Sequence, residues 1–254
     1  DRATLTLLGK QQDLLNALKA TGKPLIVVYI EGRPLDKVWA SEYADALLIA
    51  SYPGQEGGYA IADVLFGDYN PAGRLPVSVP RSVGQIPVYY NKKAPCNHDY
   101  VEQAASPLYT FGYGLSYTEF ALDHFKIEKT EIPTDGKIEV SCTVSNIGAV
   151  AGDEVVQLYQ AFHGAHVVRP NKQLAGFKRV HLNAGETKKI TFNLDTAQLG
   201  YYDEEMQFVV EPGQLDIMVG TSSEDLPFKE TINLIGEKIC IAGKRSYTCE
   251  VEEK

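Results

Sequence analysis

The sequence lacks the features that mark several large classes of protein. Acidic residues outnumber basic ones, 33 to 24, and the formal net charge is -9. This balance argues against a nucleic-acid partner, which requires a basic face. No run of about 18 apolar residues is present, so no segment is predicted to span a membrane. The 4 cysteines lie far apart without a C-x-x-C pair, which argues against a structural zinc site.

Other signatures of ligand chemistry are also missing. The glycine-rich stretch Gly54–Gly58 is not followed by the Gly-Lys-Ser/Thr ending of a phosphate-binding loop. His163 and His166 stand three apart in a predicted loop without a third ligand, so neither a metal nor a cofactor is expected. The chain begins Asp1-Arg2-Ala3 without an initiator methionine or a signal-like segment, and we expect it to be a processed or excised piece of a longer protein.

The first part of the chain has the pattern of an α/β protein. Leu8–Leu18 has an amphipathic helical pattern, and Leu25–Ile30 is an apolar run typical of a parallel strand that is covered on both faces. A second strand is predicted over Asp45–Ala50, followed by a glycine-rich turn and an apolar helix over Tyr59–Phe66. Two strands are too few for a closed sheet, so residues 1–80 are predicted to be an incomplete α/β, partly parallel-sheet sandwich.

The pattern changes twice after this region. Residues 81–119 lose periodicity and are predicted to form an ordered, extended connector, which ends in glycine-spaced aromatics that indicate tight packing against a domain. Residues 120–236 show alternating apolar residues between turn signals, which predicts an all-β sandwich of the immunoglobulin or fibronectin III type. Residues 237–254 are polar and are predicted to be a C-terminal tail or a hairpin.

Four groups of motifs stand out along the chain. They are Leu25–Leu35, with Gly32-Arg-Pro34 near its end; Asp45–Pro80, with Pro53-Gly-x-Glu-Gly57 and Gly73-Arg-Leu-Pro76; Phe111-Gly-Tyr-Gly-Leu-Ser-Tyr117; and the β-domain motifs at Gly152–Tyr159, Arg169-Pro170, Leu174–Val180 and Val209–Gly213. In this order they resemble glycoside hydrolase family 3, the β-glucosidase and β-xylosidase family. The resemblance runs almost end to end.

This resemblance implies the later part of the family's second domain followed by its fibronectin III-like domain. The parent protein would be an exo-acting retaining β-glycosidase, most simply a β-glucosidase, that acts on oligosaccharides or aryl β-glycosides and is periplasmic or secreted. Such enzymes need two carboxyl groups. In the family the nucleophile lies on an N-terminal barrel, and the acid/base glutamate precedes a motif that Asp1-Arg2 resembles. We therefore expect no catalytic residue in this chain, and we expect it to be inactive alone.

Five residues are candidates for contact with substrate. Asp1 and Arg2 would adjoin the acid/base in the whole enzyme. Glu31 and Glu56 are expected at the C-terminal edge of the sheet, with Arg33 nearby. The alternative is structural: Glu56 would accept backbone N–H groups of its own turn and pair with Arg33.

Tyrosines and cysteines of the second half of the chain leave further alternatives open. Tyr89, Tyr90 and Tyr100 would either stack on sugar or anchor the connector. Cys240 and Cys249 would either close a hairpin by a disulfide in an oxidising compartment or remain free.

Two other interpretations compete with the enzyme fragment. The first is a non-catalytic carbohydrate-binding or scaffold module built from the same domains. The second is a fragment that associates with its missing N-terminal barrel half or with a neighbouring chain. It predicts a large apolar face on residues 1–80.

Overall fold

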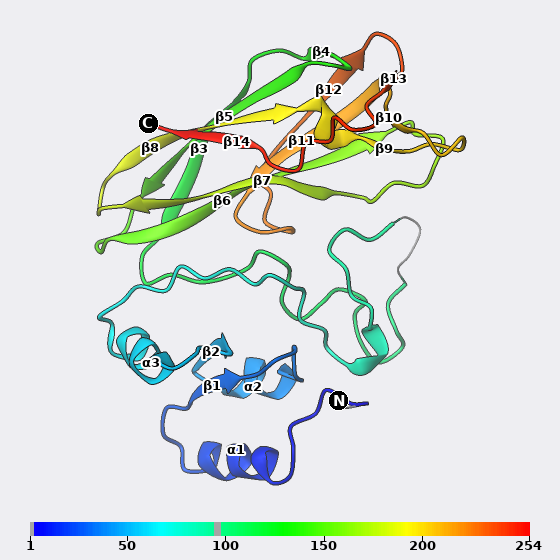
Figure 1. Cartoon of the computed structure of the whole chain (residues 1–254). Helices are drawn as coiled ribbons and strands as arrows, with labels where there is room; N and C mark the ends of the chain where they lie inside the picture. Colours follow the sequence, from blue (N-terminus) through cyan, green and yellow to red (C-terminus); the bar gives the residue numbers. More distant parts are fainter. Residues whose placement is uncertain (1–2, 94–97) are drawn as a thin grey trace. The chain divides into compact units, whose positions relative to one another are not determined.

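The structure is a computed structural model that describes residues 3–93 and 98–254. It divides into two compact units (Figure 1). Unit 1 runs to Tyr69 and also contains Val77–Tyr89 and the segment that ends at Thr110. Unit 2 contains Asn70–Pro76, the segment that begins at Tyr90, and Phe111–Lys254. The chain therefore passes repeatedly between the units before it enters the β-sandwich, whereas the sequence predicted a single connector over residues 81–119.

Unit 1 is a small α/β arrangement built on two parallel strands. They pair from Ile26 opposite Ala46 to Ile30 opposite Ser51. Its elements are α1 (Gln11–Lys19), β1 (Ile26–Ile30), α2 (Val38–Tyr43), β2 (Ala46–Ser51), α3 (Gly57–Phe66) and the 3-10 turn η1 (Val83–Gln85). Gly67 closes α3 in the left-handed conformation at φ 86°, as expected for a glycine C-cap.

The core of unit 1 is small and one-sided. Leu25, Val27, Tyr29 and Ala40 are buried together. Ile26 and Ile30 alternate with them and remain 52% and 62% exposed. The prediction that Leu25–Ile30 is covered on both faces is thus wrong for this chain, because no described layer packs over the side from which Ile26 and Ile30 project.

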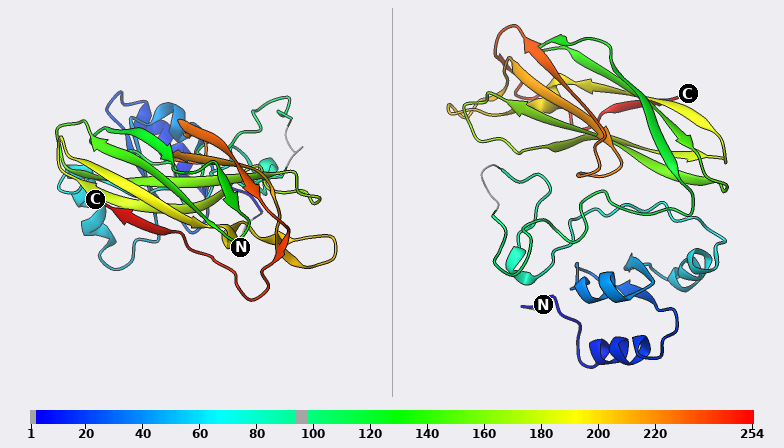
Figure 2. Two further views of the ribbon diagram at one scale, coloured as in Figure 1. Left: turned by 90° about the horizontal axis from the view of Figure 1, so that it is seen from above. Right: turned by 180° about the vertical axis from the view of Figure 1, so that it is seen from behind.

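Unit 2 is a β-sandwich with two main sheets and one small one, shown in two further views in Figure 2. The sheet orders are β4-β12-β11-β6-β7, β14-β8-β5-β3 and β13-β10-β9. The elements are β3 (Phe120–Ile127), β4 (Glu131–Pro133), β5 (Lys137–Asn146), β6 (Gly152–His163), β7 (Gln173–Leu182), β8 (Thr187–Asp195), η2 (Thr196–Leu199), β9 (Tyr201–Tyr202), β10 (Phe208–Val210), β11 (Gly213–Gly220), β12 (Phe228–Ile235), β13 (Ile239–Cys240) and β14 (Glu250–Glu253). Alternating residues such as Val140, Leu158 and Phe192 are fully buried between the sheets.

The C-terminal segment differs from the predicted tail or hairpin. β13 pairs with β10, while β14 pairs with β8 at the edge of another sheet. Of the two alternatives for Cys240 and Cys249, the structure has the free thiols: Cys240 lies on β13, whereas Cys249 directly precedes β14 of another sheet, and the two are not bridged. Burial raises the pKa of the Cys249 thiol to about 11.

Extended segments outside the strands pack closely on the sandwich within unit 2. A Cβ atom at Gly112 would lie 2.2 Å from the amide oxygen of Gln157, and one at Gly114 would lie 2.4 Å from the carbonyl oxygen of Gly73. Glycine is therefore required at both positions, as the glycine-spaced aromatics of Phe111–Tyr117 indicated.

Asp216 on β11 is the centre of a polar cluster within the sandwich. Its carboxylate accepts hydrogen bonds from His163 Nε2 at 2.8 Å and Thr231 Oγ1 at 2.6 Å, and Lys229 Nζ lies 2.8 Å away. Burial favours the neutral acid, but these partners outweigh it and lower the pKa of Asp216 from 3.8 to about 2.

We expect unit 2 to lose stability in acid as the stabilising contribution of the Asp216 carboxylate is lost. A carboxyl whose pKa falls on folding stabilises the protein above its ordinary pKa, and this contribution disappears as pH falls from about 4 toward 2. At pH 7, Asp216→Asn should therefore cost about 2 kcal/mol of unfolding free energy and should flatten the acid limb. Urea titrations at several pH values measure both effects. Asp135→Asn, at an exposed site, is the control, and an equal loss in both variants would contradict the argument.

Candidate functional site

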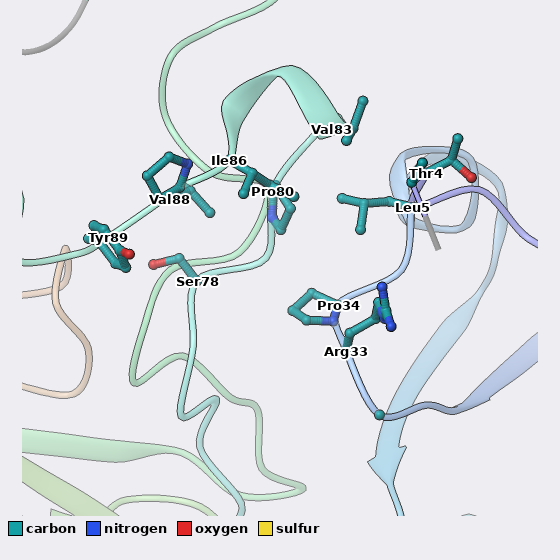
Figure 3. Close-up of a pocket in the computed structure, with 13 residues that line it drawn as sticks. Thr4, Leu5, Arg33, Pro34, Ser78, Pro80, Val83, Ile86, Val88 and Tyr89 are labelled. Atoms are coloured by element: carbon teal, nitrogen blue, oxygen red, sulfur yellow. The ribbon is translucent and has the colours of Figure 1, made fainter. Parts of the chain in front are cut away.

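Unit 1 contains a cavity of about 580 Å³. The chain just after Asp1-Arg2 and the turn after β1 form one side, and the segment Val77–Tyr89, called here the cavity wall, forms the other (Figure 3). In Figure 3, Leu5, Arg33 and Pro34 face Ser78, Pro80 and Ile86 across this space. The described lining residues are Ala3, Thr4, Leu5, Gly32, Arg33, Pro34, Ser78, Pro80, Val83, Ile86, Pro87, Val88 and Tyr89.

The cavity wall has little regular structure of its own and is held by its neighbours in unit 1. Val79 donates its N–H to Tyr109 O at 2.8 Å and accepts from Leu108 N at 2.8 Å. The side chain of Gln85 is buried and donates to the carbonyl oxygens of Ala104 and Ser106 at 2.9 and 3.1 Å. These backbone and side-chain hydrogen bonds hold the wall in an extended form.

The turn after β1 is held by a buried ion pair between Glu31 and Lys37. Lys37 Nζ lies 2.6 and 2.8 Å from the two carboxylate oxygens of Glu31 and donates to Leu35 O at 3.1 Å. The side chain of Lys37 is 0% exposed and that of Glu31 is 5% exposed. Burial lowers the pKa of Lys37, while the hydrogen bond and charge of Glu31 act in the opposite direction.

This turn places Arg33 at the cavity. Glu31 also accepts the Leu35 N–H at 3.1 Å, and Lys37 Nζ lies 4.5 Å from the centre of the Tyr29 ring. The turn Glu31–Lys37 is therefore closed on itself, and Gly32-Arg33-Pro34 face outward from it toward the cavity. A Cβ atom at Gly32 would lie 2.3 Å from the Tyr52 hydroxyl, so only glycine fits there without a shift of the tyrosine ring.

The five predicted site residues have different places. Arg33 lines the cavity, whereas Glu31 points into the ion pair with Lys37 and does not line it. Glu56 lies at the N-terminus of α3, makes no capping hydrogen bond with its side chain and is not a lining residue. The structure therefore does not bring Glu31 and Glu56 into one carboxylate pair. Asp1 and Arg2 lie outside the described residues.

The three tyrosines of the predicted connector have separate roles. Tyr89 lines the cavity, while Tyr100 donates its hydroxyl to Gly84 O at 2.9 Å. Tyr90 belongs to unit 2, where its ring stacks on Phe111 with centroids 4.2 Å apart. Tyr90 and Tyr100 thus anchor their segments, as one of the two alternatives predicted, while stacking of Tyr89 on sugar stays a prediction.

Two features of the site were missed in the sequence. Lys37 was missed because a lysine at the start of a short helix has no pattern that indicates burial. Thr4, Ser78 and the prolines of the cavity wall were missed because they come together only through the fold. The Val88-Tyr-Tyr-Asn91 tyrosine pair was the one available signal for this wall.

The arrangement suits binding better than hydrolysis. Among the described residues that line the cavity there is no carboxyl group, so the pair of acids that a retaining glycosidase requires is not assembled there. The cavity offers a guanidinium group, hydroxyl groups and an aromatic ring, which can hydrogen-bond and stack with a polar ligand. No cluster of three or more His, Cys, Asp or Glu side chains suited to a metal ion occurs in the described part of the chain.

Comparison with known proteins places both units in one family. Residues 1–117 match the model of the glycosyl hydrolase family 3 C-terminal domain, and residues 154–223 match a fibronectin type III-like domain. A periplasmic beta-glucosidase of Salmonella typhimurium is 45% identical over 233 residues, which are 87% of this chain and 30% of that protein. A beta-xylosidase of Formosa agariphila is 44% identical over 88% of this chain and 32% of its own length.

Solved structures agree with this assignment. A beta-glucosidase from Listeria innocua in complex with glucose has a TM-score of 0.88 at 36% identity, over 93% of this chain and 34% of that chain. A β-glucosidase from Erythrobacter marinus has a TM-score of 0.89 at 43% identity, over 92% and 31%. The chain thus spans about a third of the length of these relatives. By its C-terminal domain and its fibronectin type III-like domain, the chain belongs to glycosyl hydrolase family 3.

Proposed function

We propose that this chain works as the C-terminal portion of an exo-acting retaining β-glycosidase that removes terminal β-D-glycosyl residues from oligosaccharides or aryl β-glycosides. The observation that carries the proposal is the match of residues 1–117 to the family's C-terminal domain, combined with a cavity that has no carboxyl group among its described lining residues. The nucleophile and the acid/base would come from preceding polypeptide. This chain would contribute Arg33 and the cavity wall to sugar binding.

The exposed apolar surface of unit 1 supports this assignment. Phe66 is 84% exposed and Tyr59 is 75% exposed, although both lie on the apolar helix α3. Surfaces of this kind mark sites of contact with other polypeptide. The further apolar side chains that are at least 43% exposed just before and on α1, on β1 and in the turn after β2 are Leu8, Leu14, Leu18, Ile26, Ile30 and Tyr52. We propose that the remainder of the family's α/β domain and its barrel cover these residues.

A β-glucosidase is the favoured parent, because both solved structures compared above are named beta-glucosidases, and a β-xylosidase is the alternative. Relatives of both names match this chain at similar identity, 45% and 44%, so the shared region does not select between the two sugars. Export to the periplasm or the medium is favoured by the periplasmic relative. Within the described residues no helix is long and apolar enough to cross a membrane.

The proposal is tested by separating this chain from its preceding polypeptide. We expect the isolated chain to release no p-nitrophenol from p-nitrophenyl β-D-glucoside or β-D-xyloside. The polypeptide that includes the upstream part of the same reading frame should hydrolyse one of them, because only that form would hold both reactive carboxyl groups. The assay measures released p-nitrophenol, with boiled protein as the control.

Two outcomes would contradict the proposal. Turnover by the isolated chain that survives repurification would show that it has its own catalytic pair. An upstream frame without a family 3 barrel, together with binding of a β-glucan by the isolated chain, would favour the carbohydrate-binding or scaffold module instead.

A further inference from the structure

The cavity wall is the only part of the cavity lining, among the described residues, that lies between two segments of unit 2. Asn70–Pro76 precedes it and the segment that begins at Tyr90 follows it, and both belong to the β-sandwich unit. The wall itself contains only the short turn η1 and otherwise has no regular element. Contacts that fix the two ends of the wall therefore restrict the backbone conformations that the wall can adopt.

The first end is held on the sandwich by Arg74. Its Nη2 lies 2.6 Å from Glu154 Oε1 on β6, and the two side chains are only 8% and 7% exposed. The other terminal nitrogen of the guanidinium, Nη1, donates to the carbonyl oxygens of Ala72 and Gly73 at 3.3 and 3.2 Å. Leu75 then donates its N–H to Tyr113 O at 2.9 Å. A buried charge pair with these additional hydrogen bonds fixes one backbone geometry just before the wall begins.

The second end is held by Tyr90, the residue directly after the wall. Its hydroxyl oxygen accepts the Leu174 N–H at 3.1 Å, on β7. Its ring stacks on Phe111 and meets the ring of Tyr159 edge-on, with centroids 6.0 Å apart. Tyr159 on β6 is fully buried. Two residues later, Lys92 O accepts the Asn171 N–H at 2.9 Å. The backbone after Tyr90 is therefore also hydrogen-bonded within unit 2.

We propose that Arg74 and Tyr90 are positioning residues for the cavity wall, because each of them fixes the backbone of the chain at one end of the wall. Chain continuity transmits this effect, since Pro76 and Tyr90 are joined directly to the wall. The consequence for catalysis rests on the proposed function: loosening the wall would weaken sugar binding and raise KM. The chemical step would change little, because neither reactive carboxyl group lies in the wall.

The test measures the wall directly by hydrogen exchange in the 254-residue chain. The N–H groups of Val79, Gln85 and Ile86 donate within unit 1 and report on the wall. Tyr90→Phe removes only the hydroxyl acceptor and should speed their exchange about threefold, and Tyr90→Ala should speed it at least about tenfold. Amides of β5 and β8 should exchange as before. Tyr202→Phe, an exposed tyrosine on β9 of the same sandwich, is the matched control and should leave the wall unchanged.

The outcomes are distinguishable. Unchanged exchange of the wall in Tyr90→Phe and Tyr90→Ala overturns the proposal. If Tyr90→Ala unfolds β5 and β8 as well, Tyr90→Phe decides: faster exchange confined to the wall supports positioning, and no change overturns it. In the longer polypeptide, Tyr90→Phe should raise KM for the aryl glycoside severalfold at nearly constant kcat. Absence of activity in the unmodified longer polypeptide refutes the proposed function, while the exchange result still decides the positioning.

Discussion

Replacing Lys37 with methionine is expected to destabilise unit 1 by about 3–5 kcal/mol, the range found when one partner of a buried ion pair is removed. The variant leaves the Glu31 carboxylate buried, with the Leu35 N–H as its remaining hydrogen-bond donor from the turn. Trp39 is the only tryptophan of the chain and lies in α2 two residues after Lys37. Its fluorescence during urea titration therefore reports on this region.

Two further variants test whether the unpaired Glu31 carboxylate, rather than any replacement of lysine by methionine, causes the loss of stability. Lys10→Met removes an exposed partner of Asp13, with side-chain exposures of 91% and 65%, and should cost less than about 1 kcal/mol. The double variant Glu31→Leu with Lys37→Met should recover most of the loss, because it removes the orphaned charge together with its partner. A double variant less stable than Lys37→Met alone would show that the pair itself, rather than the unpaired carboxylate, determines the loss.

Ending the chain at Ile235 is expected to lower the stability of the sandwich by several kcal/mol. The truncation removes β13 and β14, and with them Ile241, which is 5% exposed in the sandwich core. It also removes Cys249, which packs against Gly176 beside Phe192. Burial of one large aliphatic side chain contributes about 1.5–3 kcal/mol, and loss of the β14 ladder exposes the edge of β8.

Differential scanning calorimetry of the chains that end at Ile235 and at Lys254 measures this effect. The control is the full chain with Cys240→Ser and Cys249→Ser. It should melt within a few degrees of the parent under both oxidising and reducing conditions, since the thiols are free. Equal melting of the truncated and full chains would mean that residues 236–254 are not part of the folded sandwich. A large shift on oxidation would mean that a disulfide forms.

Both predictions concern segments whose role is not apparent from their own composition. Lys37 is a charged residue in a short polar stretch, yet it is fully buried and closes the turn that carries Arg33. Residues 237–254 are polar, yet they supply an edge strand to one sheet and a strand to another. In each case the residues that these segments contact lie elsewhere in the chain or on another element, so the local sequence pattern does not indicate the contact.

The sequence by itself determined the element types and the family of this protein. Apolar runs, glycine turns and period-two alternation are local signals that indicate helices, strands and turns. The ordered motifs from Gly32-Arg-Pro34 to Val209–Gly213 indicate the family and can be identified without a structure. Only the tertiary structure decided that Glu31 pairs with Lys37 and that Tyr89 and Tyr90 belong to different units. It also decided that Cys240 lies on β13 while Cys249 directly precedes β14 of another sheet. These outcomes depend on which distant groups meet, and burial, ion pairing and sheet order set that only once the chain has folded.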